Sequence, residues 1–437
     1  MRSTIMYGFS RLSEQEKRQF IARYSKDPEL AERQLEEYLM RDDKERRHFL
    51  EFSENTISSF HTPYGLAPNL KVDGQVYHVP MATEESSVVA AASHSARFWA
   101  EHGGFRVTSR STVKPGQVWF RWFGDPVYLL NRWPLLKLFL LERLRKITLN
   151  MVRRGGGVQS LELLSKGSID PQLYQLELQV DTADSMGANF INTCLEDLAE
   201  GLVQFFALDS DPEGKNLQVV MAILSNYTPA CTISVESSCR VEGLKPMADN
   251  LDPVLFAEKL ELAFRIANSD VSRAVTHNKG IMNGVDAVLL ATGNDHRAAE
   301  ASAHAYASRD GHYRSLSWCK TEDGVFSLGL TLPLAVGTVG GITHLHPLAR
   351  LSLEILGNPG AGELMGIVAA TGLASNFSAV RSLVTTGIQQ GHMRLHLSNL
   401  LNLYHATPRQ REIATNYFRN KKVSYDAVKH FLHEQPC

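Results

Sequence analysis

Four ionisable side chains stand in apolar or glycine-rich surroundings, where a charge is costly unless it is paired. They are Glu85, just before a run of small residues; Lys279, in Thr-His-Asn-Lys-Gly-Ile-Met-Asn-Gly; Asp295, after an apolar run; and His392, near the start of the polar C-terminal segment. Two carboxyls, an ammonium and an imidazole can form one coupled acid–base site. Taken singly, each also has an ordinary interpretation, as a helix-cap acid, a surface lysine, an N-cap aspartate and an exposed histidine.

Signatures of several other chemistries are missing from the sequence. The glycines from Gly357 to Gly366 have the wrong spacing for a Rossmann dinucleotide motif and follow a helix-like segment. No P-loop and no G-x-S-x-G nucleophile motif is present. His392 and His396 have the spacing of zinc ligands on a helix, but Met393 stands where the metalloprotease signature has glutamate. We therefore expect no metal.

Short elements with clear boundaries would position the candidate residues. Asp73-Gly74 separates two strand-like runs and predicts a hairpin. Ser87 is a candidate N-cap for a helix of small side chains, which Gly103-Gly104 would end. Ser13 and Glu16 form a capping box at the start of a long charged helical stretch. Local signals thus predict a hairpin and a closely packed helix on either side of Glu85.

A change of pattern predicts a smaller domain inserted in a larger one. Between about residues 111 and 219, strand-like runs at 117–123, 175–180 and 217–224 are mixed with two helical stretches. Mostly helical patterns resume afterwards, with a hairpin-like segment at 317–332. We expect an α+β protein: a large, mostly helical domain at 1–110 and 220–387, a small non-Rossmann α+β domain at 111–219, and a C-terminal helical unit at 388–437.

Length and composition are those of a soluble enzyme with two or three domains. The 437 residues carry a net charge of −2, which does not predict a nucleic-acid or anionic-membrane partner. The five cysteines include no C-x-x-C pair, which argues against a disulfide framework or a zinc site. The N-terminus lacks a signal-peptide core, and no apolar run approaches the roughly 20 residues of a membrane span. We expect a cytoplasmic protein.

The segments around the four ionisable residues resemble those of 3-hydroxy-3-methylglutaryl-coenzyme A (HMG-CoA) reductases, particularly the soluble class II type. The similar segments are Val-Pro-Met-Ala-Thr-Glu-Glu-Ser-Ser at 79–87, Asp-Ser-Met-Gly-Ala-Asn at 184–189, Thr-His-Asn-Lys-Gly-Ile-Met-Asn-Gly at 276–284, Ala-Thr-Gly-Asn-Asp at 291–295, Gly-Thr-Val-Gly-Gly at 337–341 and Gln-Gly-His-Met-Arg-Leu-His at 390–396. They stand in the family's order. Class I members carry a membrane anchor, and the expected absence of one favours class II.

The resemblance implies a role for each matching residue. The catalytic residues would be Glu85, Lys279, Asp295 and His392. Substrate would be bound by Ser87, Arg273, Asn283 and Arg11. The cofactor would be bound by Asp184, Met186, Gly187, Ala188, Asn189 and Thr148. Lys279 would stabilise negative charge on the carbonyl oxygen and Glu85 would protonate that oxygen, while His392, on a mobile C-terminal flap, would protonate the departing thiolate.

The reaction implied by the resemblance is the reduction of HMG-CoA to mevalonate and coenzyme A with two NAD(P)H, or its reverse, in the mevalonate pathway of isoprenoid metabolism. The active site would lie between the subunits of a homodimer. Two alternatives remain open from the residues: an oxidoreductase of the same fold acting on another CoA thioester, and a non-catalytic CoA-binding relative. The second expects one of the four catalytic positions to be substituted, and none is.

The choice between NADPH and NADH depends on one position. NAD-using members of the family can place an aspartate seven residues before the glycine run, where this chain has Thr148. A threonine would not repel a 2′-phosphate, and Arg145, Lys146, Arg153 and Arg154 lie nearby in the sequence. We therefore expect NADPH, against the alternative that these basic residues only form a solvated helix face.

Overall fold

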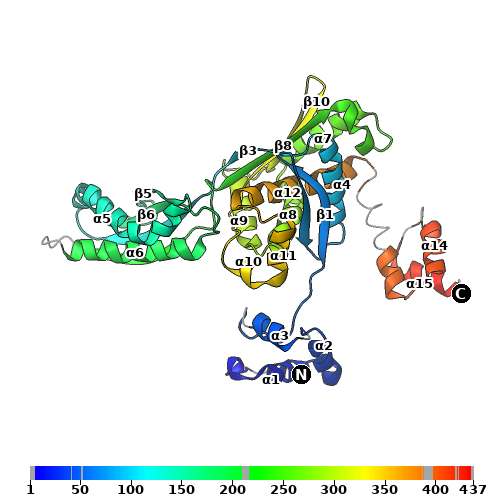
Figure 1. Cartoon of the computed structure of the whole chain (residues 1–437), viewed down its shortest axis with the longest axis horizontal. Helices are drawn as coiled ribbons and strands as arrows, with labels where there is room; N and C mark the ends of the chain where they lie inside the picture. Colours follow the sequence, from blue (N-terminus) through cyan, green and yellow to red (C-terminus); the bar gives the residue numbers. More distant parts are fainter. Residues whose placement is uncertain are drawn as a thin grey trace. The chain divides into compact units, whose positions relative to one another are not determined.

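The computed structural model describes residues 5–40, 42–50, 53–208, 216–385, 387, 397–418, 421 and 423–434. It divides the chain into two units, Met1–Pro63 and Tyr64–Cys437 (Figure 1). The N-terminal unit contains a short 3-10 helix, η1 (Phe9–Arg11), and the helices α1 (Glu14–Ala22), α2 (Pro28–Glu37) and α3 (Asp43–Leu50).

The capping box predicted at the start of α1 is present, since Ser13 and Glu16 bond each other reciprocally. The single helical stretch predicted beyond it is wrong, because α2 begins anew at Pro28. The carboxylate of Asp27 caps this second helix by accepting a hydrogen bond from Leu30 N at 2.9 Å. Proline at the first position suits a helix start and interrupts a continuous one.

The larger part of the second unit consists of a hairpin, a four-stranded sheet and a set of helices. Its strands are β1 (Tyr64–Val72), β2 (Gln75–Ala82), β3 (Arg106–Arg110), β8 (Thr232–Arg240), β9 (Ser317–Glu322) and β10 (Val325–Pro333). Its helices are α4 (Val88–Glu101), η3 (Val241–Met247), α7 (Pro253–Ser269), α8 (Val271–Ala291), α9 (His296–Ala307), α10 (Ile342–Leu345), α11 (Pro347–Ile355) and α12 (Ala361–Val384). One hydrophobic core joins most of these elements.

The predicted hairpin is confirmed, because Val72 pairs with Gln75 across a turn formed by Asp73 and Gly74. Both turn residues have positive φ, at 47° and 86°, as a tight two-residue turn requires. The other strands form an antiparallel sheet in the order β3-β8-β10-β9, which includes the predicted hairpin of β9 and β10.

Helix α12 lies at the centre of this core and packs against α4 and α8 (Figure 1). The contact with α8 is close because both helices carry glycine there: a Cβ on Gly284 would lie 2.8 Å from Thr371 O, and one on Gly372 would lie 2.7 Å from a methyl group of Val285. Helix α12 is long and apolar enough to cross a membrane. However, 72% of its most apolar 18-residue stretch is buried inside the protein, as in a core helix.

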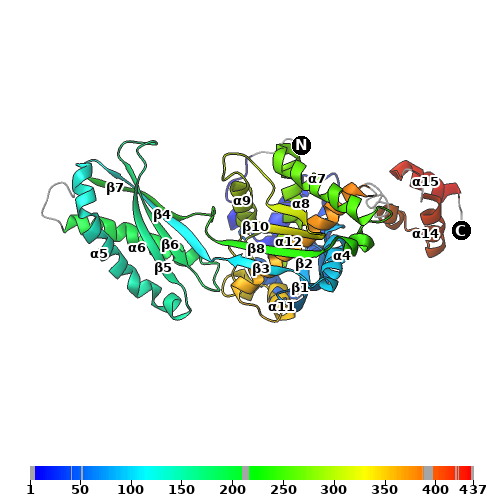
Figure 2. The same cartoon turned by 90° about the horizontal axis from the view of Figure 1, so that it is seen from above.

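A smaller α+β part is inserted between β3 and β8. It contains β4 (Val113–Trp122), α5 (Pro126–Arg153), β5 (Gly157–Ser165), β6 (Leu173–Asp181), α6 (Ala188–Ala207) and β7 (Leu217–Leu224). The strands form an antiparallel sheet in the order β5-β6-β4-β7, and α5 and α6 cover one face of it over a separate hydrophobic core (Figure 2). A Rossmann fold needs parallel strands, so the predicted non-Rossmann α+β class is confirmed.

The C-terminal segment contains α14 (Pro408–Tyr417) and α15 (Tyr425–Glu434), and residues 397–403 are also helical. These helices enclose a third small core around Leu401, Ala414 and Val428. The domain limits at 110, 219 and 387 remain predictions; the inserted strands run from Val113 to Leu224.

Candidate active site

Glu85 and Lys279 form an ion pair between two elements that are far apart in the sequence. Glu85 lies in the turn between β2 and α4, where its backbone N–H donates to Thr83 Oγ1 at 3.2 Å. Lys279 lies on α8, and its Nζ donates to Glu85 Oε2 at 2.8 Å. The lysine side chain is 58% exposed and that of the glutamate 35% exposed, so a ligand can reach the pair.

Asn283 extends this pair into a polar cluster. It lies one helical turn after Lys279, and its Nδ2 donates to the same Glu85 oxygen at 3.3 Å. Asp286 follows on the same face of α8. Burial and the nearby Glu300 raise the pKa of Asp286 to about 7, and its Oδ1 is buried with no hydrogen-bond partner among the described residues.

Buried polar side chains fix the segment of α8 that carries Lys279. His277 Nε2 and the hydroxyl of Ser317 are 2.6 Å apart, and burial lowers the pKa of His277 to about 3, so the ring is neutral at physiological pH. Asn278 donates to Arg314 O at 2.8 Å and accepts from Leu316 N at 3.0 Å. The residues before Lys279 in this motif therefore hold the helix in place.

The residues expected to bind substrate lie in three places. Ser87 is the N-cap of α4, and its side chain makes no capping hydrogen bond. Arg273 lies on the first turn of α8 and is half-buried, which lowers the pKa of its guanidinium. Arg11 ends η1 in the N-terminal unit and is exposed. Asn283, expected beside Lys279, contacts Glu85 as described above.

Asp295 does not join this cluster within one chain. It is the N-cap of α9, where its Oδ1 accepts a hydrogen bond from Ala298 N at 3.0 Å. Lys279 and the end of α8 at Ala291 are twelve residues apart, which is about 18 Å along the helix axis. The structure thus brings Glu85, Lys279 and Asn283 together and holds Asp295 well apart from them. His392 lies outside the described residues.

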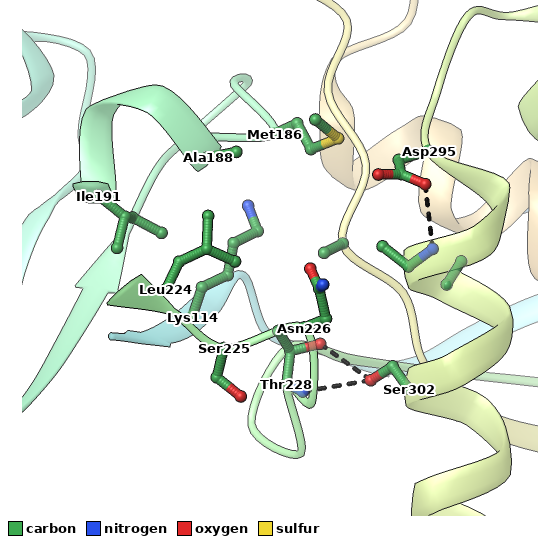
Figure 3. A pocket seen from close by; sticks show the side chains of 13 residues that line it. Lys114, Met186, Ala188, Ile191, Leu224, Ser225, Asn226, Thr228, Asp295 and Ser302 are labelled. Atoms are coloured by element: carbon green, nitrogen blue, oxygen red, sulfur yellow. Dashed lines mark hydrogen bonds between the residues drawn. The ribbon is translucent and has the colours of Figure 1, made fainter. Parts of the chain in front are cut away.

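Asp295 instead lines a pocket shared with the inserted α+β part (Figure 3). The pocket contains about 480 Å³ of empty space, open solvent included. The lining residues are Lys114, Met186, Ala188, Ile191, Leu224, Ser225, Asn226, Thr228, Asp295, Ala298, Ala299, Ser302 and Ala335. Met186 and Ala188 belong to the segment expected to bind the cofactor, so these two of the predicted cofactor residues face the same space as Asp295.

The loop before α6 is anchored on the large part of the unit. Asp184 Oδ1 accepts from Ala361 N, at the start of α12, at 2.7 Å, and Asp184 O accepts from Thr338 N at 2.9 Å. A Cβ on Gly337 would lie 2.2 Å from Met186 N, so this position has no room for a side chain. The Gly-Thr-Val-Gly-Gly segment therefore packs directly against the loop. One carboxylate oxygen of Asp184 caps the core helix α12.

Gly187 gives α6 an uncapped start. Its φ is 85°, and a Cβ there would lie 2.4 Å from the methyl group of Thr182. As the N-cap of α6 it offers no side-chain acceptor, which leaves first-turn N–H groups available to a ligand. Ala188 and Asn189 form that first turn, and Asn189 is exposed.

Thr148 lies on the buried face of α5. It is 5% exposed, and its hydroxyl donates to Leu144 O at 2.9 Å, so the side chain faces its own domain. The basic residues near it, Arg145, Lys146, Arg153 and Arg154, are exposed. The glycine turn after α5 meets the start of the cofactor loop, since a Cβ on Gly156 would lie 2.5 Å from Asp181 O. The basic end of α5 therefore adjoins that loop.

Among the residues that line this pocket, the sequence predicted Met186, Ala188 and Asp295; Lys114, Asn226 and Ser302 are among those it did not predict. The position of Lys114 in the sequence did contain a signal. It lies an even number of residues before the buried Val118 and Phe120 in β4, so its side chain is on the same, inner face of the strand, where a charge is unusual. Asn226 and Ser302 lie in unremarkable polar surroundings, and we find no sequence signal for them. The described residues contain no group of three or more potential metal ligands.

The fold and the site together define a class of protein. An antiparallel, non-Rossmann domain with a glycine-containing loop and an uncapped helix faces Asp295, while a lysine–glutamate pair lies elsewhere on the same unit. This is the arrangement expected of a reductase whose cofactor and acid–base groups belong to different domains.

Comparisons with known proteins identify the family. A family model described as hydroxymethylglutaryl-coenzyme A reductase matches residues 13–397. The 3-hydroxy-3-methylglutaryl-coenzyme A reductase of Archaeoglobus fulgidus is 36% identical over 380 residues, covering 87% of this chain and 84% of the relative. A probable reductase of the same name from Borreliella burgdorferi is 36% identical over 356 residues, covering 80% and 77%. The chain belongs to the HMG-CoA reductase family and is an oxidoreductase.

Solved structures agree with this assignment. A class II HMG-CoA reductase from Streptococcus pneumoniae, bound to NADPH in open conformations, is 38% identical with a TM-score of 0.70, over 89% of this chain and 92% of that one. Another structure of the reductase from the same organism has a TM-score of 0.72 at 36% identity and covers 98% and 99%. The predicted resemblance to class II is confirmed.

Proposed function

We propose that this chain interconverts HMG-CoA and mevalonate at a site to which two subunits contribute, with Lys279 and Glu85 at its centre. The observation that carries the proposal is the 2.8 Å contact between Lys279 Nζ and Glu85 Oε2, with Asn283 on the same oxygen. This arrangement offers one fixed cation and one carboxyl to a carbonyl oxygen placed beside them.

Each group in this cluster has a defined task. The carbonyl oxygen gains negative charge during reduction, and the ammonium of Lys279 stabilises it; removing one such donor from a dry site typically costs about 3 kcal/mol. Glu85 must first take up a proton, since its ion pair with Lys279 involves the carboxylate; once protonated, it donates that proton to the same oxygen. Asn283 holds the glutamate in position. Arg273 suits the free carboxylate of the substrate, because a guanidinium pairs well with a carboxylate.

A homodimer supplies what one chain lacks. Asp295 follows the end of α8, which lies about 18 Å along the helix axis from Lys279, and Asn294 N bonds to Leu289 O near that end, so the side chains of Asp295 and Lys279 are held apart. A second copy that places its Asp295 beside the Lys279–Glu85 pair would complete the site, and twofold symmetry would give two identical sites. His392, on the C-terminal segment, would protonate the coenzyme A thiolate: a histidine of pKa about 6.5 suits a leaving group whose thiol has a pKa of about 8.5.

The cofactor is NADPH or NADH, which supplies the hydride. The residues present fit an anionic dinucleotide: Gly187 opens the approach to α6, the first-turn N–H groups are free of a side-chain cap, and Met186 and Ala188 line the pocket. The exposed basic residues at the end of α5 favour NADPH, as does the NADPH in the S. pneumoniae relative. Because Thr148 is buried, it would not contact the cofactor. It would favour NADPH only because it places no negative charge near the 2′-phosphate.

The protein would work in the cytoplasm as a soluble enzyme. The apolar helix α12 is a core element, and the relatives that match over most of their length include bacterial and archaeal enzymes. HMG-CoA, mevalonate and coenzyme A are the expected ligands, with no nucleic acid and no membrane as partner.

A steady-state assay tests the proposal. Oxidation of NADPH and of NADH is followed with HMG-CoA, acetoacetyl-CoA and succinyl-CoA. We expect turnover with HMG-CoA, loss of at least about 100-fold in Lys279→Ala, and no loss in Lys320→Ala. Lys320 is the matched control because it makes an exposed 2.7 Å ion pair with Glu322 on β9. Faster turnover of another thioester would support the alternative substrate, and no turnover of any would support a binding protein.

A further inference from the structure

Lys114 is a charged residue inside the protein that the mechanism above does not use. It lies on β4 and is only 3% exposed. Its ammonium donates to the hydroxyl of Thr182 and, at 3.2 Å, to Ser185 O. The same hydroxyl donates to Ser185 O at 2.6 Å. The lysine therefore ties together the turn from which the cofactor loop begins.

The ammonium has no ion-pair partner among the described residues, although buried charges are normally paired. Cys231 and Asp181 influence it through space, but Asp181 Oδ1 accepts a hydrogen bond from Ala183 N at 2.8 Å. Burial lowers the pKa of Lys114, the direction that follows from removing a cation from water without a counter-ion. Both hydrogen-bond acceptors are neutral, so an anion nearby would stabilise the charged form.

The pocket described above is a space that Lys114 helps to line. Lys114 lines it together with Met186 and Ala188, and its amino group points toward these two residues (Figure 3). Asp295 contributes to the opposite wall, without an ion pair to Lys114. The buried cation thus faces the place where the loop and the start of α6 would meet a dinucleotide.

We propose that Lys114 is a further cofactor-binding residue of the dinucleotide site, whose buried ammonium both shapes the Thr182–Gly187 loop and provides the positive charge that attracts the cofactor's diphosphate. The inference rests on the proposed function and adds to it a residue outside the family motifs considered above. The lysine acts on cofactor binding. It does not act on the acid–base cluster around Glu85, which lies on other elements.

The two effects of Lys114 are separable by a pair of substitutions. Lys114→Met removes the charge and both hydrogen bonds while keeping much of the side-chain volume. Thr182→Val removes one hydrogen bond to the ammonium and keeps the charge. The dissociation constants of NADPH and of HMG-CoA are measured for each protein by fluorescence titration and calorimetry, with thermal unfolding as a check on folding.

We expect Lys114→Met to weaken NADPH binding by about 10- to 100-fold, the loss typical of a hydrogen bond to a charged group, and to change HMG-CoA binding less than about twofold. Thr182→Val should weaken NADPH binding by less than about fivefold. In the wild type, inorganic diphosphate should compete with NADPH, and in Lys114→Met it should compete much more weakly.

Three results would overturn the inference. They are unchanged NADPH affinity in a folded Lys114→Met variant, equal losses in Lys114→Met and Thr182→Val, and equal losses of NADPH and HMG-CoA affinity. The second result would reduce the lysine to a support of the loop. A wild-type protein that binds no dinucleotide at all would instead contradict the proposed function, so the two failures are distinguishable.

Discussion

Mixing two inactive subunits would test whether the active site is built from two chains. One chain carries Lys279→Ala and the other Asp295→Asn, and each is expected to be inactive alone. If Asp295 acts on the Lys279–Glu85 pair of a second subunit, a mixed dimer contains one site with both native residues and one site with neither. Mixing the two variants should therefore restore activity, although no chain in the mixture is native.

The expected magnitude follows from the geometry of α8 and from twofold symmetry. Twelve residues of helix separate Lys279 from Ala291 by about 18 Å, so one chain cannot supply both groups to one site. Random association makes half of the dimers mixed, and each has one intact site, so the mixture should reach about one quarter of the native rate. A purified mixed dimer should reach about one half.

The assay uses two differently tagged chains that are co-expressed and purified through both tags in turn. The matched control pairs Lys279→Ala with Glu85→Gln, because the structure places these two residues in contact on the same chain. In that mixed dimer each site lacks one of the two groups, and the rate should stay at the background of the single variants. Mass spectrometry verifies that both chains are present.

Two outcomes would refute the reasoning. A verified mixed dimer of Lys279→Ala and Asp295→Asn that stays inactive would mean that Asp295 does not serve the other subunit. Recovery in the control pair would mean that Glu85 and Lys279 act from different chains, against the 2.8 Å contact. Either result leaves the family assignment intact and removes the proposed assembly of the site.

Three further substitutions test features of the loop and of α8. Gly337→Ala would place a Cβ 2.2 Å from Met186 N and should lower NADPH affinity, measured by titration, while native-like affinity would show that the loop moves freely. Asp184→Ala removes the cap at Ala361 N and should lower the free energy of unfolding by about 1 kcal/mol in denaturant titration; loss of cofactor affinity at unchanged stability would make Asp184 a ligand instead. The pKa of Asp286 is raised to about 7, so its contribution to stability is lost as the pH rises from about 4 to about 7, whereas His277, whose pKa is lowered to about 3, contributes in the opposite sense below about 6.5. The free energy of unfolding of the wild type minus that of Asp286→Asn should therefore fall between about pH 4 and 7 and level off above that, and a difference that does not change with pH would contradict the raised pKa.

The elements that local signals specify could be predicted from the sequence. Asp73-Gly74 fixes a two-residue turn, and Ser13 with Glu16 fixes a helix start, because both depend only on neighbouring residues. The break before α2 was predictable as well, since Asp27-Pro28 is a capping residue followed by proline. The antiparallel order β5-β6-β4-β7 was not, because it depends on contacts between distant segments.

The sequence suggests candidate site residues more readily than it suggests their arrangement. Similarity of segments selects Glu85, Lys279 and Asp295 as candidates, and their roles stay predictions; it does not say which of them meet within one chain. The glycines at 280 and 284 disfavour a helix when read locally. They are tolerated in α8 because Gly284 allows close contact with α12, so packing outweighs propensity there. The separation of Lys279 and Asp295 becomes apparent only when α8 is known to be one continuous helix.

That continuous helix also gives a reason for placing the site between subunits. Within one chain, α8 holds Lys279 beside Glu85, and the start of α9, just beyond the end of α8, places Asp295 at the pocket of Met186 and Lys114. In the proposed dimer, the acid–base pair of one subunit would therefore face the cofactor pocket of its partner, and Asp295 would be the residue common to both. The reaction needs two reduced cofactors in succession. In such a site, one subunit would exchange the cofactor through its pocket while the other subunit holds the partly reduced substrate. This division of tasks requires that the two ligands be bound mainly by different chains.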